Sequence, residues 1–161
     1  MSQAVRPIPE NFTSVTPYLT CEGADKALAF YQEAFGAVEV ARMASPEGKI
    51  LHAEIRIGNA MIMLSDDFPE FNSLGPLALK GSPVGVHLYV EDADAAWHRA
   101  LAAGATPLMP LADAFWGDRF GMLVDPFGHR WSIATHVRDM TPAQIEEAMK
   151  SMPAGCPDAQ P

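Results

Sequence analysis

The chain contains one short pattern twice, and this repeat constrains the fold more than any other feature. The stretch from Tyr18 to Ala27 recurs from His87 to Ala96, with leucine, glutamate, alanine, aspartate and alanine at matching offsets. Each copy is typical of a strand, a short acidic turn and an amphipathic helix. Two copies are too few for a solenoid, so we expect two half-domains that pair and leave a cavity at their junction.

Composition excludes several classes of protein. The chain has 161 residues, of which 48% are hydrophobic, enough for one domain with a core. Its formal net charge of -9 argues against a nucleic-acid-binding surface. Cys21 and Cys156 are too far apart and too few for a disulfide framework or a metal motif. We expect no signal segment, no membrane span and a cytoplasmic location.

Hydrophobic periodicity in the first half predicts one helix among four strands. The helix is expected at 24–35, and the strands at 14–20, 38–43, 51–57 and 60–64. Gly36 follows the helix where a C-terminal glycine belongs. In the third strand, alternation places His52, Glu54 and Arg56 on one face.

The second half predicts the same order of elements. The strands are expected at 84–90, 106–110, 120–124 and 129–135, and the helix at 93–103. Asp92 is a suitable N-cap for this helix. A third helix is expected after Thr141, where Pro142 and Gln144 complete a capping box. Residues 114–119 are expected to form a loop.

These elements predict an α+β fold with two β-α-β-β-β modules. The modules should form an open, curled sheet around a cavity, with the helices on the other face. The expected divisions are a lead-in (1–12), one domain (13–138) with modules at 13–66 and 83–138, a linker (67–82), and a C-terminal helix with a flexible tail (139–161).

Several motifs in this order resemble a known family. Phe30-Tyr31 before Ala34-Phe35-Gly36, the Asp125–His129 hairpin turn and the Phe115–Arg119 loop resemble motifs of the vicinal oxygen chelate superfamily, which includes glyoxalase I, bleomycin-resistance proteins and extradiol dioxygenases. The similarity covers about residues 13–138, and it is closest to the PhnB-like subgroup. The resemblance implies a small-molecule ligand and a homodimer that completes the cavity, sometimes with exchanged modules.

The resemblance also implies where a metal would be held. The superfamily's metal enzymes carry His or Glu at four inward strand positions, which correspond here to Thr16, Met63, Gly85 and Ser132. A catalytic divalent site needs imidazole or carboxylate donors, usually three or more. We therefore expect no metal and no cofactor.

Three polar residues are candidates for chemistry. His52 and Glu54 share a strand face, and His87 lies on the corresponding inward face of the second half. An imidazole beside a carboxylate suits proton transfer near neutral pH, so these residues are candidate catalytic groups. A displaced metal site and an ordinary solvated polar face are the alternatives.

The 114–119 loop offers a further candidate. Trp116 could stack against a ligand while Arg119 clamps an anionic group. Alternatively, Asp118 pairs with Arg119 and Trp116 closes the end of the sheet. Ser132 has no His–Asp arrangement in register and is not expected to act as a nucleophile, and His129 is expected to be exposed.

The leading functional hypothesis is metal-independent binding of a small molecule. The predicted lining of the cavity is Thr16, Tyr18, His52, Glu54, Met63, His87, Tyr89, Trp116, Arg119 and Ser132. One alternative is a glyoxalase-like lyase or isomerase that uses His52, Glu54 or His87. The other is sequestration of a cationic antibiotic of the bleomycin type, which the acidic charge would suit.

Overall fold

The structure is a computed structural model in which residues 5–151 are described. The start of the predicted lead-in, the predicted flexible tail and Cys156 lie outside these residues. Two four-stranded sheets and four α-helices form the described fold, so the predicted α+β class and the repeated β-α-β-β-β order are confirmed.

The first sheet has the strand order β1-β4-β3-β2. Its elements are β1 (Tyr18–Cys21), α1 (Ala24–Phe35), β2 (Val38–Ala44), β3 (Ile50–Ile57) and β4 (Ala60–Asp66). β1 runs parallel to β4, and the other neighbours are antiparallel. As predicted, α1 ends at Gly36, whose φ of 66° is left-handed.

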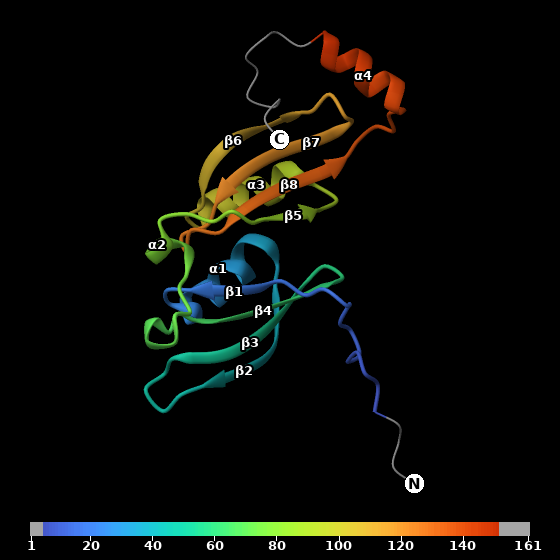
Figure 1. Cartoon of the computed structure of the whole chain (residues 1–161). Helices are drawn as coiled ribbons and strands as arrows, with labels where there is room; N and C mark the ends of the chain where they lie inside the picture. The colour runs from blue at the N-terminus through green and yellow to red at the C-terminus, as the bar shows by residue number, and fades with distance from the viewer. Residues whose placement is uncertain (1–4, 152–161) are drawn as a thin grey trace.

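The second sheet repeats this topology in the order β5-β8-β7-β6. Its elements are β5 (Gly85–Tyr89), α3 (Ala93–Ala102), β6 (Thr106–Asp113), β7 (Asp118–Val124) and β8 (Arg130–His136). β5 is parallel to β8, which mirrors the pairing of β1 with β4. Figure 1 shows the two sheets one above the other, each with its own helix.

Several boundaries differ from the sequence prediction; β6, for example, continues to Asp113, whereas the predicted strand ends at residue 110. The first strand was expected to start at residue 14 but starts at Tyr18, because Pro17 has no N–H and contributes only its carbonyl, which accepts from the Met63 N–H at 2.9 Å. The loop expected at 114–119 is shorter, since Asp118 and Arg119 already pair in β7.

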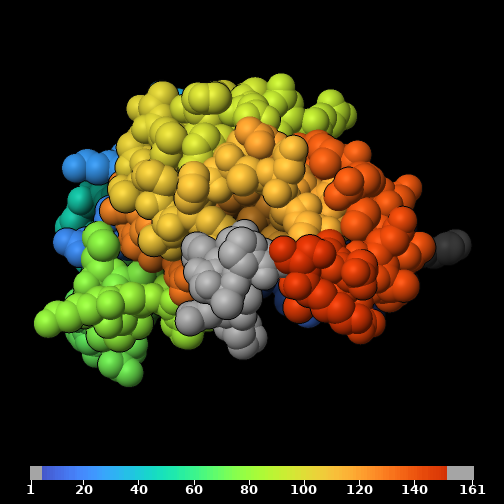
Figure 2. Space-filling view, turned by 90° about the horizontal axis from the view of Figure 1, so that it is seen from above, coloured from blue at the N-terminus to red at the C-terminus, as the bar shows by residue number. Residues whose placement is uncertain are grey.

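The segment that joins the two sheets is more ordered than a simple linker. It contains the 3-10 turn η1 (Pro69–Phe71) and the short helix α2 (Pro76–Leu79). After β8 the chain enters α4 (Pro142–Lys150), where Thr141 and Gln144 form the predicted capping box. α2 and α4 lie on opposite sides of the molecule (Figures 1 and 2).

One apolar core joins both halves on the helix side of the sheets. α1 packs against α3, and the ring centroids of Phe35 and Trp131 are 4.6 Å apart. The Tyr31 hydroxyl donates to the buried Asp125 carboxylate at 2.7 Å, which ties the first half to the second. The opposite face of each sheet is therefore left uncovered by residues 5–151, as the exposure of Tyr18 and Tyr89 shows.

No helix in residues 5–151 is both long enough and apolar enough to span a bilayer.

Candidate ligand-binding faces

The open face of the first sheet carries a chain of three hydrogen-bonded side chains. The Tyr18 hydroxyl lies 3.1 Å from Nδ1 of His52, and Nε2 of His52 lies 3.3 Å from Oε1 of Glu54. A carboxylate can only accept, so Nε2 carries the proton in the neutral ring and Nδ1 accepts from Tyr18. When it donates to His52, the Tyr18 hydroxyl oxygen keeps its capacity to accept a hydrogen bond from another group.

Strand register places Met63 between the two ends of this relay. Met63 is the neighbour of Tyr18 on β1 and of Glu54 on β3. His52 and Glu54 are half-buried, while their strand neighbours Ala53 and Ile55 are buried in the core. From His52 to Ile57, alternation on β3 therefore separates the polar face from the core, as the sequence predicted.

The open face of the second sheet is aromatic. His87 packs edge-on against Tyr89 at 4.5 Å between ring centroids and lies nearly parallel to Phe120 at 6.1 Å. Phe120 in turn meets Trp116 edge-on at 5.2 Å, and Phe115 meets Trp116 at 4.9 Å. Such rings present a continuous surface that suits flat or aromatic groups.

His87 and Ser132 form a pair that the sequence prediction missed. They are direct neighbours on β5 and β8, and Oγ of Ser132 lies 2.7 Å from Nδ1 of His87. A histidine is thus in register with Ser132 after all, but no carboxylate hydrogen-bonds to His87 in residues 5–151. Without an orienting acid, the pair supports ligand hydrogen bonding better than nucleophilic catalysis.

Asp118 is the polar centre of the second face. This carboxylate is only 3% exposed and accepts from the Tyr89 hydroxyl at 2.9 Å and from Nε1 of Trp116 at 3.0 Å, while Nδ1 of His136 donates to it at 2.8 Å. Burial opposes ionisation, but these three hydrogen bonds outweigh burial and lower the pKa of Asp118. Asp118 therefore fixes the position of Trp116.

His136 lies between two carboxylates at the edge of this face. Its Nε2 is 3.0 Å from Oδ1 of Asp139, and its Nδ1 contacts Asp118. Both ring nitrogens must donate to satisfy both acids, so the imidazolium form is favoured. Asp139, followed by Asp118, raises the pKa of His136.

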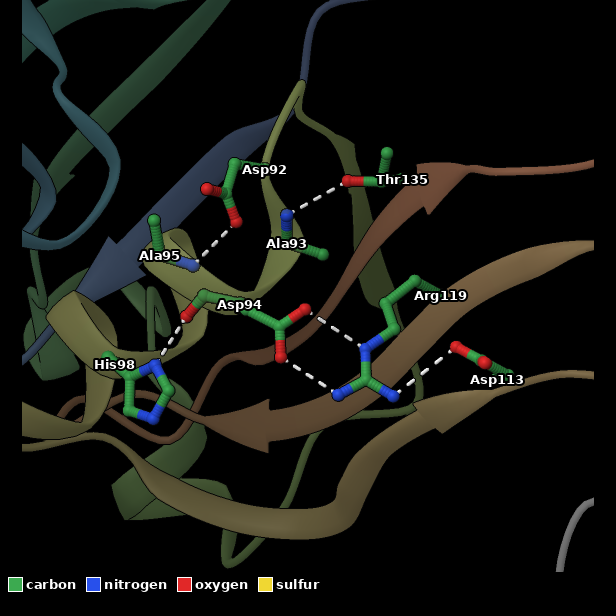
Figure 3. A network of polar contacts seen from close by, with 8 residues as sticks. All are labelled: Asp92, Ala93, Asp94, Ala95, His98, Asp113, Arg119 and Thr135. Atoms are coloured by element: carbon green, nitrogen blue, oxygen red, sulfur yellow. Dashed lines mark hydrogen bonds and ion pairs between the residues drawn. The ribbon is translucent and has the colours of Figure 1, made fainter.

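Arg119 lies on the helix side of its sheet, away from the open face. Its guanidinium makes two hydrogen bonds to Asp94 at the start of α3, at 2.8 and 3.0 Å, and a third to Asp113 at 3.3 Å (Figure 3). These contacts raise the pKa of Arg119, with Asp94 as the main cause. The structure therefore does not bring the predicted anion clamp to the candidate site, nor does Arg119 pair with Asp118.

The remaining predicted residues divide into two groups, one on each sheet. Tyr18, His52, Glu54 and Met63 share the first face, and His87, Tyr89, Trp116 and Ser132 share the second. Thr16 lies just before β1. No hydrogen bond or ring contact within residues 5–151 links the two groups.

The donors present do not fit a divalent metal. Met63 offers a thioether, Gly85 has no side chain, and the Ser132 hydroxyl is hydrogen-bonded to His87. Within the described part of the chain, no three side chains of His, Cys, Asp or Glu are grouped so that they could hold an ion. The chemistry of these positions thus favours neutral contacts over metal coordination.

His129 is buried, although the sequence predicted that it would be exposed. Nε2 of His129 lies 3.0 Å from the Thr20 carbonyl and 3.6 Å from Sγ of Cys21, so it joins β1 to the turn before β8. Burial, followed by the Asp125 charge, raises the pKa of Cys21 to about 12. His129 and Cys21 are structural groups outside both open faces.

Comparison with known proteins decides the family. Residues 13–133 match the Glyoxalase/Bleomycin resistance protein/Dioxygenase superfamily. The chain belongs to this superfamily. An uncharacterized protein of Mycobacterium bovis is 44% identical over 145 residues, which cover 88% of this chain and 95% of that protein.

Solved structures of other proteins share the fold. TioX from Micromonospora sp. ML1 is 27% identical, with a TM-score of 0.61 over 78% of this chain and 99% of TioX. A PhnB protein from Bacillus cereus is 21% identical, with a TM-score of 0.61 over 76% of this chain and 99% of its own. The resemblance to the superfamily that the motifs indicated is confirmed.

Proposed function

We propose that this chain is a metal-independent small-molecule-binding protein whose ligand lies on the open sheet faces. One observation carries the proposal. The strand positions that hold the metal in the superfamily's enzymes have no strong donors here, whereas the positions beside them carry aromatic rings and paired hydrogen-bonding groups. A site of this composition binds by stacking and hydrogen bonds.

The two faces suggest the chemistry of the ligand. On the second face, Tyr89, Trp116 and Phe120 offer ring surfaces, and Asp118 holds Trp116 in place. On the first face, Tyr18 offers an oriented hydroxyl acceptor beside the adaptable side chain of Met63. A flat molecule with a peripheral N–H or O–H donor could stack on the rings of the second face and donate to the hydroxyl of the first.

A homodimer would complete the site. Because the shared core lies on the helix side of both sheets, the open faces need a cover that residues 5–151 do not supply. A second copy of the chain would enclose a ligand between two open faces and exclude water. We expect this dimer to act in the cytoplasm. Sedimentation velocity tests this step, and a monomer that still binds ligand with full affinity would contradict it.

Ligand-observed NMR with planar aromatic fragments, in the presence of chelator, tests the binding proposal. Trp116→Ala should weaken every fragment that binds by about tenfold, since base or ring stacking contributes roughly 1–3 kcal/mol. Trp116→Phe should retain most of the affinity, and Arg119→Gln, on the other face of β7, should leave it unchanged. Fragment affinity that does not respond to Trp116→Ala would contradict the proposal.

The hydrogen-bonded relay on the first face favours one alternative, a glyoxalase-like lyase or isomerase. Glu54 could hold His52 in the tautomer that takes a proton from Tyr18. The test is turnover of the hemithioacetal of methylglyoxal and glutathione in chelator. Activity lost in both Tyr18→Phe and Glu54→Gln would replace the binding proposal by this one.

Sequestration of a cationic antibiotic is the remaining alternative, and the charge of -9 suits it. Asp118, the buried acid of the aromatic face, is already saturated by three partners and is not available to a ligand cation. Thermal unfolding in the presence of a bleomycin-type glycopeptide tests this alternative. An unchanged melting temperature at saturating drug would remove it.

A further inference from the structure

A pocket lies at one end of the second sheet, where α2 meets β6, β7 and β8. Its volume is about 320 Å³, within the range of small-molecule sites. Leu77 of α2, Leu108 of β6 and Val124 of β7 supply apolar walls, and Lys80, Ser82 and Arg130 supply the polar part. The segment that carries α2 lies on the side of the molecule opposite α4 (Figure 2).

The charge of this pocket is unusual for such an acidic chain. Two of the chain's 11 Lys and Arg residues, Lys80 and Arg130, line it, and no Asp or Glu of residues 5–151 does. Within residues 5–151 neither cationic side chain has a hydrogen-bond or ion-pair partner, whereas Arg42 and Arg119 are each held by two carboxylates. The pocket is therefore a local positive site in a protein of net charge -9.

The backbone at Lys80 provides an independent observation. Lys80 has a φ of 59°, a left-handed conformation at the C-terminus of α2 that normally favours glycine. A side chain in this conformation costs roughly 1 kcal/mol or more, and a glycine is the very next residue. The strained lysine at this position is consistent with a use for its side chain.

The packing below the pocket keeps α2 in place. Gly128 lies so close to α2 that a Cβ there would be 2.8 Å from Cβ of Pro76 and 3.3 Å from Cδ2 of Leu77. The short helix thus packs on the turn before β8, and Lys80 and Arg130 both line one preformed cavity. Little reorganisation is needed for a ligand to enter.

We propose that this pocket binds a small organic anion: a carboxylate or phosphate monoester that carries an aromatic or branched apolar group. The anion would lie between Lys80 and Arg130, which pair well with oxyanions, and the apolar group would contact Leu77, Leu108 and Val124.

Strand register places Val124 and Arg130 on the same side of the sheet as Met122 and Ser132, so the pocket lies at the end of the second open face. None of the residues that carry the proposed function lines it, and it does not depend on that function.

Titration calorimetry of the full chain with phenyl phosphate and with benzoate tests the proposal. Binding of one molecule per chain by either anion is expected, and it should weaken as salt is raised because charge pairing is screened. Benzyl alcohol and inorganic phosphate, which lack the charge and the ring respectively, should each bind at least about tenfold more weakly. Failure of both ring-bearing anions to bind at millimolar concentration would overturn the proposal, as would equal binding of benzyl alcohol.

Variants locate the site. Lys80→Gly and Arg130→Gln should each weaken the anion by about tenfold or more. Lys80→Gly should also leave the melting temperature unchanged or higher, because it relieves the left-handed backbone, so lost binding cannot be ascribed to lost folding. Arg99→Gln, a change of an exposed cation on α3, is the matched control. Affinity that is unchanged in both pocket variants, or reduced equally in the control, would overturn the assignment.

Discussion

The two modules share one framework but fasten it with different residues. In the repeat, Asp25 at the start of α1 corresponds to Asp94 at the start of α3. Asp25 pairs with Arg42 of β2 at 2.6 Å, whereas Asp94 pairs with Arg119 of β7 at 2.8 Å. The acidic end of the helix is retained in both copies, while the strand that supplies its cation has changed.

The helix N-termini differ in the same way. α3 is capped locally, since Asp92 accepts from the Ala95 N–H at 2.9 Å. α1 starts at a glycine with no side-chain cap, and Asp66 at the end of β4 accepts instead from the N–H groups of Gly23 and Ala24. The same backbone requirement is met by a neighbour in sequence in one module and by a neighbour in space in the other.

The open faces differ most. The first carries the relay of Tyr18, His52 and Glu54, and the second carries aromatic rings around Asp118. The comparison indicates that the helix side of each sheet is constrained by packing, whereas the open face is where the two modules have specialised.

The largest expected effect concerns the residue that joins the modules. Asp125 is buried and accepts hydrogen bonds from Tyr31, Trp131 and two backbone N–H groups, so Asp125→Ala leaves four buried donors unpaired. Urea denaturation should show a loss of about 3–5 kcal/mol in the free energy of unfolding. Asp66→Ala, whose contacts lie within the first module, should lower the free energy of unfolding by less. Equal losses in the two variants would contradict a particular role for Asp125 in joining the modules.

The next largest loss of stability is expected when a glycine in a hairpin turn is replaced. Gly117 in the β6–β7 turn has a φ of 105°, and an added Cβ would lie within 2.1 Å of the Arg138 carbonyl oxygen. Gly48 in the β2–β3 turn has a φ of 88° but nothing within 4 Å of that position. Gly48→Ala should therefore cost about 1 kcal/mol, from backbone conformation alone.

Gly117→Ala should cost more, about 2–4 kcal/mol, because the clash adds to the conformational cost. It should also displace Trp116, which thermal denaturation and tryptophan fluorescence would both detect. Equal melting temperatures for the two variants would mean that the 137–138 segment is not held against this turn.

His136, in the second module, should make the stability of the fold depend on pH. Because the pKa of His136 is raised, its charged form stabilises the fold fully below pH about 6.5, and this stabilisation is lost as pH rises through the raised pKa. Asp118 acts in the opposite direction, since its lowered pKa contributes stability that is lost only in acid.

Denaturation measured from pH 5.5 to 8.5 tests whether the stabilisation by His136 falls as the pH rises. His136→Gln should flatten the decline in stability on the alkaline side, while His98→Gln, on the exposed face of α3, should not. A steeper decline in the His136 variant would contradict the assignment of its charge.

The smallest effects are expected at the helix ion pairs. Arg42→Gln and Arg119→Gln should each lower the melting temperature only slightly, because both pairs are solvent-exposed. Raising the salt concentration should shrink both differences in melting temperature. A loss in either variant that survives high salt would point to packing, not charge.

Most of the fold follows from local sequence signals. The helix at 24–35, its terminal glycine, the Asp92 cap and the capping box after Thr141 all depend on residues a few positions apart, and all were predicted. The start of β1 was wrong because Pro17 could be placed either inside the strand or before it. The His52–Glu54 pair was found because strand alternation alone brings the two residues to one face.

Contacts between distant residues could not be predicted. The role of Asp118 depends on partners 2 to 29 positions away, and the role of Arg119 on a helix 25 positions earlier. Arg119 was expected in a loop beside the cavity, but it lies on β7, where alternation places it on the opposite face from Asp118. His129 was predicted to be exposed because its partner, Thr20, belongs to the other module.

Metal titration of protein freed of metal by chelator tests the central claim most directly. Zn²⁺, Mn²⁺ and Ni²⁺ would each be added while the unfolding temperature is measured, in the native chain and in Glu54→Gln. Since no strong donors occupy the superfamily's metal positions, we expect no saturating rise at one ion per chain and the same curve for both proteins. A rise that saturates at one equivalent and disappears in Glu54→Gln would contradict a metal-independent site.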